Sequence, residues 1–228
     1  MHIRLVNITA LVLLISAAAA AQENLYSVAV SSSYTTTAKL FYNPNDPSDY
    51  NRSQFSPLDD IFGFGIEVRR TFEGSIVQIG ASVEYISKRE RFFDTNTSPF
   101  VQGYDGFTAF PIEITGYVMI PFNSETANMY IGGGAGAYIG RRNYEYGGVA
   151  SQTIAQQLGY GIHILTGFEY ALRPAVVLLG ELKFRDLQFE STNVFSSRAG
   201  FTPPYSGPFT SRFSIDGMTM KVALAVRL

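Results

Sequence analysis

The sequence predicts an all-β fold, an eight-stranded antiparallel up-and-down transmembrane β-barrel with short periplasmic turns and long extracellular loops. First, apolar and polar residues alternate with a period of two in eight segments. Second, the connections between these segments are alternately long and short. Third, only 16% of the residues are charged, while 18 Phe and 14 Tyr are present. A soluble domain usually has about 25% charged residues.

The eight segments each place apolar side chains on one face and small or polar side chains on the other. Residues 61–70, for example, put Phe62 and Phe64 opposite Gly63 and Gly65. Each segment is long enough to cross a membrane as a tilted strand, which takes roughly 9–11 residues. The segments are 25–34, 61–70, 77–85, 110–120, 129–140, 159–170, 176–185 and 218–228.

The connections alternate in length, which is typical of extracellular loops on one side and periplasmic turns on the other. An even number of strands places both ends of the barrel on the periplasmic side. The short connections are 71–76, 121–128 and 171–175. The long connections are 35–60, 88–106, 141–157 and 188–213.

Residues 1–21 are predicted to be a cleaved secretory signal peptide. Arg4 supplies the positive charge, residues 8–15 form a short apolar core, and residues 17–21 are alanines suited to cleavage. Residues 22–228 then form one barrel domain.

Composition excludes several classes of function. The formal net charge of −2 over 228 residues argues against a nucleic-acid binder, because such proteins gather positive charge. The chain has no cysteine, which excludes disulfides, thiol catalysis and cysteine-based zinc sites. We expect no cofactor and no bound metal.

Alternation alone would also fit a soluble, lipocalin-like barrel with its apolar face inward. The composition of the polar face favours the membrane barrel, because its many glycines suit a narrow, filled lumen better than a solvated surface. Its charges are balanced, as buried charges must be, and we expect Glu181 to reach Lys221 or Arg227. The predicted lumen network is Glu67, Arg69, Glu84, Glu113, His163, Glu169, Glu181, Lys183, Arg185, Lys221 and Arg227.

Four stretches carry a resemblance: FPIEITGYVMIPF (110–122), MYIGGGAGAYIG (129–140), GIHILTGFEYAL (161–172) and SIDGMTMKVALAVRL (214–228). The chain resembles the small eight-stranded outer-membrane β-barrels of the outer-membrane-protein A, X and W class. The resemblance implies a place in the outer membrane of a Gram-negative bacterium, among its lipids and lipopolysaccharide. The last stretch looks like the terminal strand that the barrel-insertion machinery recognises, although it ends in Leu228 rather than an aromatic residue.

His163 shares the inner face with Glu169 and is a candidate general base. Outer-membrane lipid A deacylases need a serine two residues beyond the histidine, and Leu165 stands there. A hydrogen-bonded lumen histidine is therefore expected, and the chain is predicted not to be an enzyme.

Two further patterns have structural interpretations. Gly132, Gly134 and Ala137 fit a loose G-x-G-x-x-A, but a strand rather than a helix follows, which favours lumen packing over a dinucleotide site. The oxygen-rich first loop is expected to be a solvated turn rather than a calcium site, because prolines interrupt it and it lacks glutamate. Its side chains are Asn43, Asn45, Asp46 and Asp49.

The long connections are rich in aromatic residues, which indicate either an interfacial girdle on extended strands or a surface that binds an extracellular ligand. Examples are Phe41, Tyr42, Phe92, Phe93, Phe100, Tyr144, Tyr146, Phe195, Phe201 and Phe209. The leading hypothesis is a structural or surface-interaction barrel with a charge-plugged lumen. The alternatives are a narrow channel or carrier for small or hydrophobic solutes and, third, a lipid-modifying enzyme.

Overall fold

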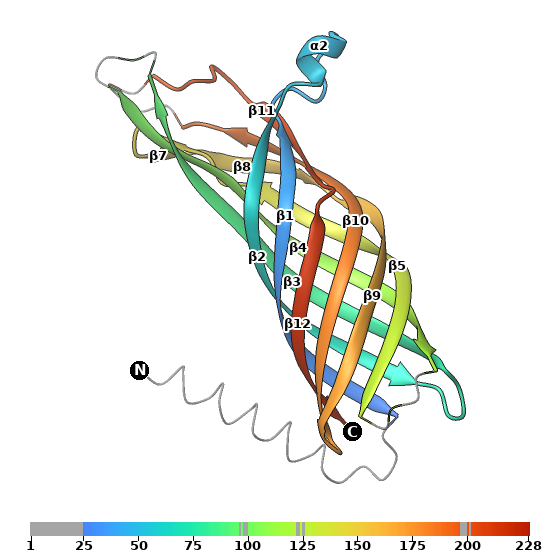
Figure 1. Ribbon diagram of the computed structural model, residues 1–228. Coiled ribbons are helices and arrows are strands. Elements are labelled where there is room, and N and C mark those ends of the chain that lie inside the picture. The colour runs from blue at the N-terminus through green and yellow to red at the C-terminus, as the bar shows by residue number, and fades with distance from the viewer. Residues whose placement is uncertain are drawn as a thin grey trace, which may run out of the picture.

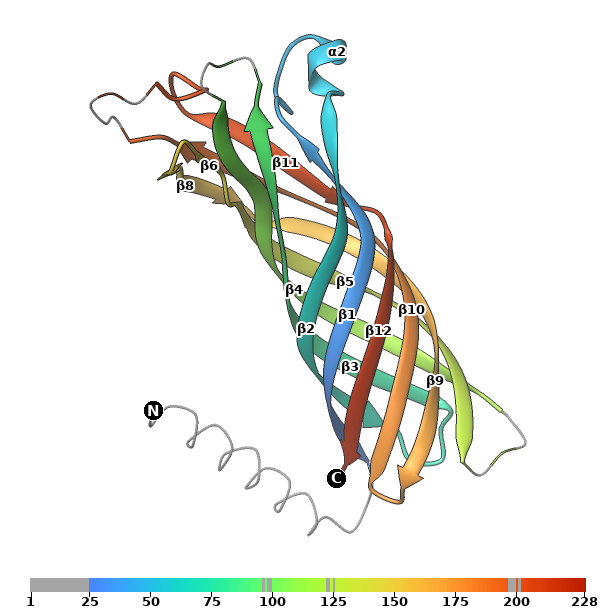
Figure 2. The ribbon, with the colours of Figure 1, turned by 60° about the vertical axis from the view of Figure 1, so that its left-hand side comes forward.

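The computed structural model describes residues 25–95, 97, 100–121, 124, 126–196, 200 and 202–228, so the predicted signal peptide lies outside the described residues. Eight long strands pair in chain order, each antiparallel to the next. The last pairs with the first from Ser27 opposite Arg227 to Thr35 opposite Thr219, which closes the ring (Figures 1 and 2). The strands are β1 (Tyr26–Phe41), β2 (Phe55–Thr71), β3 (Val77–Asp94), β4 (Val101–Ile120), β5 (Ala127–Arg142), β9 (Gly159–Arg173), β10 (Val176–Val194) and β12 (Met218–Arg227).

The predicted strands are confirmed in number and order, but the predicted long loops are too long. β1 continues to Phe41 and β3 to Asp94, so much of the connections 35–60, 88–106, 141–157 and 188–213 is strand. The hydrogen-bonded ladders continue above the lipid-facing band because inward apolar side chains there still pack against one another. The short turns at the other end agree with prediction.

The extracellular end carries the short elements α2 (Asp49–Arg52), β6 (Glu145–Tyr146), β7 (Val149–Ala150), β8 (Gln152–Gln157) and β11 (Phe209–Ile215). Figure 1 shows α2 at the end opposite the C-terminus. β11 extends the line of β12 along β1 and β10, with a bulge at residues 216–217 where the register with β1 shifts by one residue. In the part of the chain that the structure describes, no helix is long and apolar enough to cross a membrane.

The apolar face of the alternation points outward. Phe64, Ile112 and Ile164 are each about half exposed or more, whereas Glu67, Glu113 and His163 are buried. Aromatic side chains gather towards the two ends of this outward band, as in the girdles of outer-membrane barrels. The extracellular girdle consists of Phe62, Tyr85, Phe110, Tyr160 and Phe184, with the partly buried Tyr34 against Phe62. The periplasmic girdle consists of Tyr26, Phe72, Phe168 and Tyr170.

Charge on the outward band should be costly. Ile112→Arg or Leu224→Arg is expected to lower the free energy of unfolding by roughly 2–4 kcal/mol, because both side chains face outward in the band. Phe93→Arg is the matched control, since Phe93 is equally exposed but lies beyond the girdle, where the cost falls to about 0–1 kcal/mol. Urea titration in phospholipid vesicles measures both. Equal costs at Ile112 and Phe93 would contradict a lipid-facing band.

Topology can be tested on intact cells. Cysteines placed at the exposed Ser48 and Ser206 should react with an impermeant thiol reagent, because both lie at the α2 end. A cysteine at Glu73, in the turn between β2 and β3, should not react. Glu73 is preferred to its neighbour Gly74, whose φ of 64° disfavours a side chain. Labelling of the cysteine at position 73 on intact cells would show that the barrel has the opposite orientation in the membrane.

Candidate functional site: the barrel lumen

Glycines on the inner face make room for large charged side chains. A Cβ atom at Gly65 would lie 2.8 Å from Glu84 Cγ, and one at Gly80 would lie 3.0 Å from both Glu67 Oε1 and the Tyr117 ring. The lumen is therefore filled by side chains from the opposing strands, as expected for an eight-stranded barrel.

Two layers of charged side chains lie in the lumen, and we call the one nearer the periplasmic end the lower charge layer and the other the upper charge layer. The lower charge layer consists of four buried side chains, Glu67, Arg69, Glu181 and Lys221. Arg69 donates from Nε to Glu67 Oε1 at 2.7 Å and also pairs with Glu181. Lys221 Nζ lies 2.7 Å from Glu67 Oε2 and 2.7 Å from Glu181 Oε2. Each cation thus contacts both carboxylates, and the four charges cancel.

Two tyrosines complete the lower charge layer. The Tyr117 hydroxyl donates to Glu67, and the Tyr130 hydroxyl donates to Glu181 at 2.8 Å. The Arg69 guanidinium lies 4.1 Å from the centre of the Tyr117 ring. These contacts add hydrogen bonds to both carboxylates, which makes burial of the paired charges less costly.

The upper charge layer consists of Glu84, Glu113, Lys183 and Arg185, again two anions and two cations. Lys183 Nζ lies 2.6 Å from Glu113 Oε2, and Arg185 Nη2 lies 2.6 Å from Glu84 Oε2. His163 joins this layer, with Nε2 2.8 Å from Thr115 Oγ1 and Nδ1 3.8 Å from Glu113 Oε1.

The remaining predicted pair sits near the periplasmic mouth. Arg227 Nη2 lies 3.0 Å from Glu169 Oε1, and Asn128 donates to the same oxygen at 3.1 Å. All eleven predicted side chains therefore point into the lumen. Glu181 pairs with Lys221 rather than Arg227, because Lys221 is directly opposite Glu181 in the β10–β12 register.

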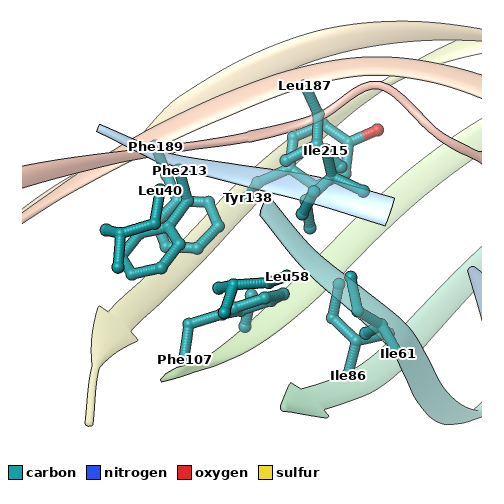
Figure 3. Packing of buried hydrophobic residues seen from close by; sticks show 12 residues of the cluster. Leu40, Leu58, Ile61, Ile86, Phe107, Tyr138, Leu187, Phe189, Phe213 and Ile215 are labelled. Carbon is teal, nitrogen blue, oxygen red and sulfur yellow. The ribbon is translucent and has the colours of Figure 1, made fainter. Parts of the chain in front are cut away.

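Above the upper charge layer, a cluster of twelve buried residues fills the lumen (Figure 3). Phe213 lies between two other rings, with its centroid 5.1 Å from Phe107 and 5.1 Å from Phe189. Figure 3 shows these rings and the aliphatic side chains turned towards one another from several strands. We call this cluster the apolar plug: Ala38, Leu40, Leu58, Ile61, Ile86, Phe107, Ala109, Tyr138, Leu187, Phe189, Phe213 and Ile215.

The apolar plug was not predicted, since the sequence interpretation assigned closure of the lumen to charges alone. On β10, Leu187 and Phe189 follow Arg185 at every second position and therefore also face inward. This alternation could have predicted that they lie in the lumen. They were missed because the predicted strand ended at residue 185 and residues 188–213, which include Phe189, were assigned to a loop.

A buried ion pair lies above the plug. Arg142 donates to Asp105 from Nε at 2.8 Å and from Nη2 at 2.5 Å, and from Nη1 to Ser211 at 2.8 Å. Burial lowers the pKa of Arg142, but the hydrogen bond and charge of Asp105 outweigh it and raise that pKa. Burial also raises the pKa of the neighbouring Tyr144 hydroxyl. The arginine is therefore charged and the tyrosine neutral at physiological pH.

Aromatic residues of the predicted loops surround Arg142. Tyr144, Tyr146, Phe195 and Phe209 form a buried cluster inside the mouth, with Phe92 packed against it. They belong neither to an outer girdle nor to an exposed surface, whereas Phe93 and Phe100 are exposed. Phe201 lies outside the described residues.

The other candidate motifs have structural roles. Asp46 accepts hydrogen bonds from the Ser48 amide at 2.8 Å and the Asn51 side chain at 3.3 Å, as in a polar turn. Among the described residues, no group of three or more histidines and carboxylates could hold a metal ion. Gly132 and Gly134 lie within β5, which continues beyond them as a strand to Arg142.

Solved structures share this architecture. The structure is similar to Neisserial surface protein A (NspA), with 13% identity, a TM-score of 0.51, and coverage of 89% of this chain and 97% of that one. It is also similar to OprG from Pseudomonas aeruginosa, with 10% identity, a TM-score of 0.53, and coverage of 89% and 95%. The fold is that of the small outer-membrane β-barrel proteins. No family model and no curated protein matches the sequence.

Proposed function

We propose that this protein is a non-enzymatic integral barrel of the bacterial outer membrane, with a structural or surface-interaction role and a closed lumen. The outward apolar band between two aromatic girdles supports the membrane location. The same proposal includes removal of residues 1–21 on export and insertion through the C-terminal strand. It also places the barrel among outer-membrane lipids and lipopolysaccharide.

The observation that carries the proposal is the filling of the lumen at successive levels. Two neutral layers of paired charge lie beneath the apolar plug, and the Arg142–Asp105 pair lies above it. A conducting pore needs a continuous water path, whereas Lys183, Phe107 and Phe213 are at most 1% exposed. A closed lumen leaves the extracellular surface as the part of the barrel able to act on other molecules.

Exposed aromatic residues at the extracellular end support a surface-interaction role. Tyr50, Phe93 and Phe100 expose half or more of their surface there. Exposed aromatic side chains are frequent anchors of protein interfaces. A ligand bound through the extracellular loops is thus part of the proposal.

Burial of His163 weighs against the enzymatic alternative. The side chains lie next to one another in the arrangement of a nucleophile, a base and an orienting acid, namely Thr115, His163 and Glu113. Lys183 and Arg185 also contact Glu113, and His163 is buried in the charge layer beneath the plug. A lipid substrate would have no route to the Thr115 hydroxyl.

One observation favours a carrier as the second candidate. β8 pairs with β10, and in the described residues no ladder joins β8 to β5. A cleft of about 490 Å³ lies between the ends of β5 and β8, where the two strands separate. A solute could enter the wall there, but it would reach the periplasm only if the plug and both charge layers moved.

Swelling of proteoliposomes distinguishes the two roles. Vesicles containing the purified barrel should swell in an isosmotic solution of a small sugar no faster than protein-free vesicles, while an open porin serves as the positive control. Uptake of small or hydrophobic solutes above the protein-free rate would support the carrier and refute the closed lumen.

A further inference from the structure

The cleft where β8 parts from β5 is lined by polar and basic side chains. Its lining includes Arg89, Arg141, Asn143, Glu145, Ser151 and Thr153. Arg142 also contributes to it, but its guanidinium is paired with Asp105. Arginines outnumber the single glutamate of this lining, so the cleft favours an anion.

Arg89 is held in place while remaining accessible. Its Nη2 lies 2.9 Å from Glu145 Oε2, and its guanidinium lies 4.1 Å from the centre of the Tyr104 ring. Over half of its side chain is exposed nevertheless. Arg141 is exposed and has no acidic partner among the described residues. One oriented and one unpaired guanidinium are suited to bidentate recognition of phosphate.

The position of the two arginines indicates where the anion comes from. Arg141 lies two residues beyond the outward-facing Ile139 on β5, and Arg89 lies four residues beyond Tyr85 of the extracellular girdle. At roughly 3.3 Å per residue along a tilted strand, both lie just outside the hydrocarbon. Lipid headgroups occupy this level.

We propose that the cleft binds a phosphate of a lipid headgroup in the outer leaflet, such as the phosphorylated glucosamine of lipopolysaccharide. The inference rests on the proposed membrane location and specifies which lipid contact is made there. The site extends from β3 towards β5 and not towards β2, because β2, the other neighbour of β3, exposes Asp59 and Asp60 at this level. Their carboxylates would repel a phosphate.

The test compares detergent-solubilised, folded barrel binding to phosphorylated lipid A and to the same lipid after enzymatic dephosphorylation. The double variant Arg89→Gln/Arg141→Gln is matched by Arg70→Gln/Arg173→Gln, which removes two arginines at the periplasmic end, where Arg70 lies near the Tyr26 and Phe72 rings. We expect the first variant to weaken binding of phosphorylated lipid A about tenfold, equivalent to about 1.4 kcal/mol. The second should leave it unchanged.

Equal affinity for the two lipids, or equal loss in the two double variants, would overturn the lipid-phosphate site. Competition by inorganic phosphate at concentrations similar to those of the lipid would assign the site to a soluble anion instead, and would also overturn it. Insertion of the wild type into vesicles is measured in parallel. A barrel that inserts but shows no phosphate preference refutes this inference alone, whereas failure to insert refutes the proposed function as well.

Discussion

Replacing Glu181 with alanine is expected to lower the free energy of unfolding by about 3–5 kcal/mol, because removal of one partner leaves buried charge uncompensated. Glu181 is buried and contacts both Arg69 and Lys221, while Tyr130 donates a hydrogen bond to it. Without this carboxylate, Glu67 alone would face the two cations. Urea titration in phospholipid vesicles gives the change.

The matched control for Glu181 is Glu169→Ala, because Glu169 is also an inward-facing glutamate paired with an arginine. Its partner Arg227 keeps 31% of its side chain exposed, so solvent can replace the lost carboxylate and the pair contributes at most about 1 kcal/mol. Similar losses for the two variants would show that the lower charge layer is hydrated rather than closed.

Truncation of Phe213 to alanine should destabilise the barrel by about 3–5 kcal/mol, the usual range for a buried phenylalanine that leaves a cavity. Phe213 is fully buried in the apolar plug and contacts Phe107 and Phe189. Phe93→Ala is the control, since Phe93 is exposed on the outer face and its loss should change stability by less than about 1 kcal/mol. The same urea titration measures both, and a negligible effect at Phe213 would contradict a packed plug.

The strands could be predicted because a lipid-facing wall requires a strict period of two. Phe62, Phe64 and Ile66 must face lipid, so the residues between them face the lumen. The inward charges could be predicted for the same reason. The choice between Lys221 and Arg227 as the partner of Glu181 could not, since it depends on the register between β10 and β12.

The extracellular half was harder to predict because its inner face changes character. On β10, Glu181, Lys183 and Arg185 are followed at the same parity by Leu187 and Phe189. The prediction required polar residues at the inward positions, so an apolar residue there appeared to break the alternation. The predicted strands therefore ended too early. The aromatic cluster around Arg142 was missed for a related reason, since loop composition does not show whether a ring turns inward.

The current carried by single wild-type barrels in a planar lipid bilayer tests the closed lumen most directly. Two ion-paired layers and the apolar plug predict that insertion produces no current steps above those of the protein-free bilayer. Steady, reproducible single-channel conductance of the wild type would contradict the closed lumen and favour the channel.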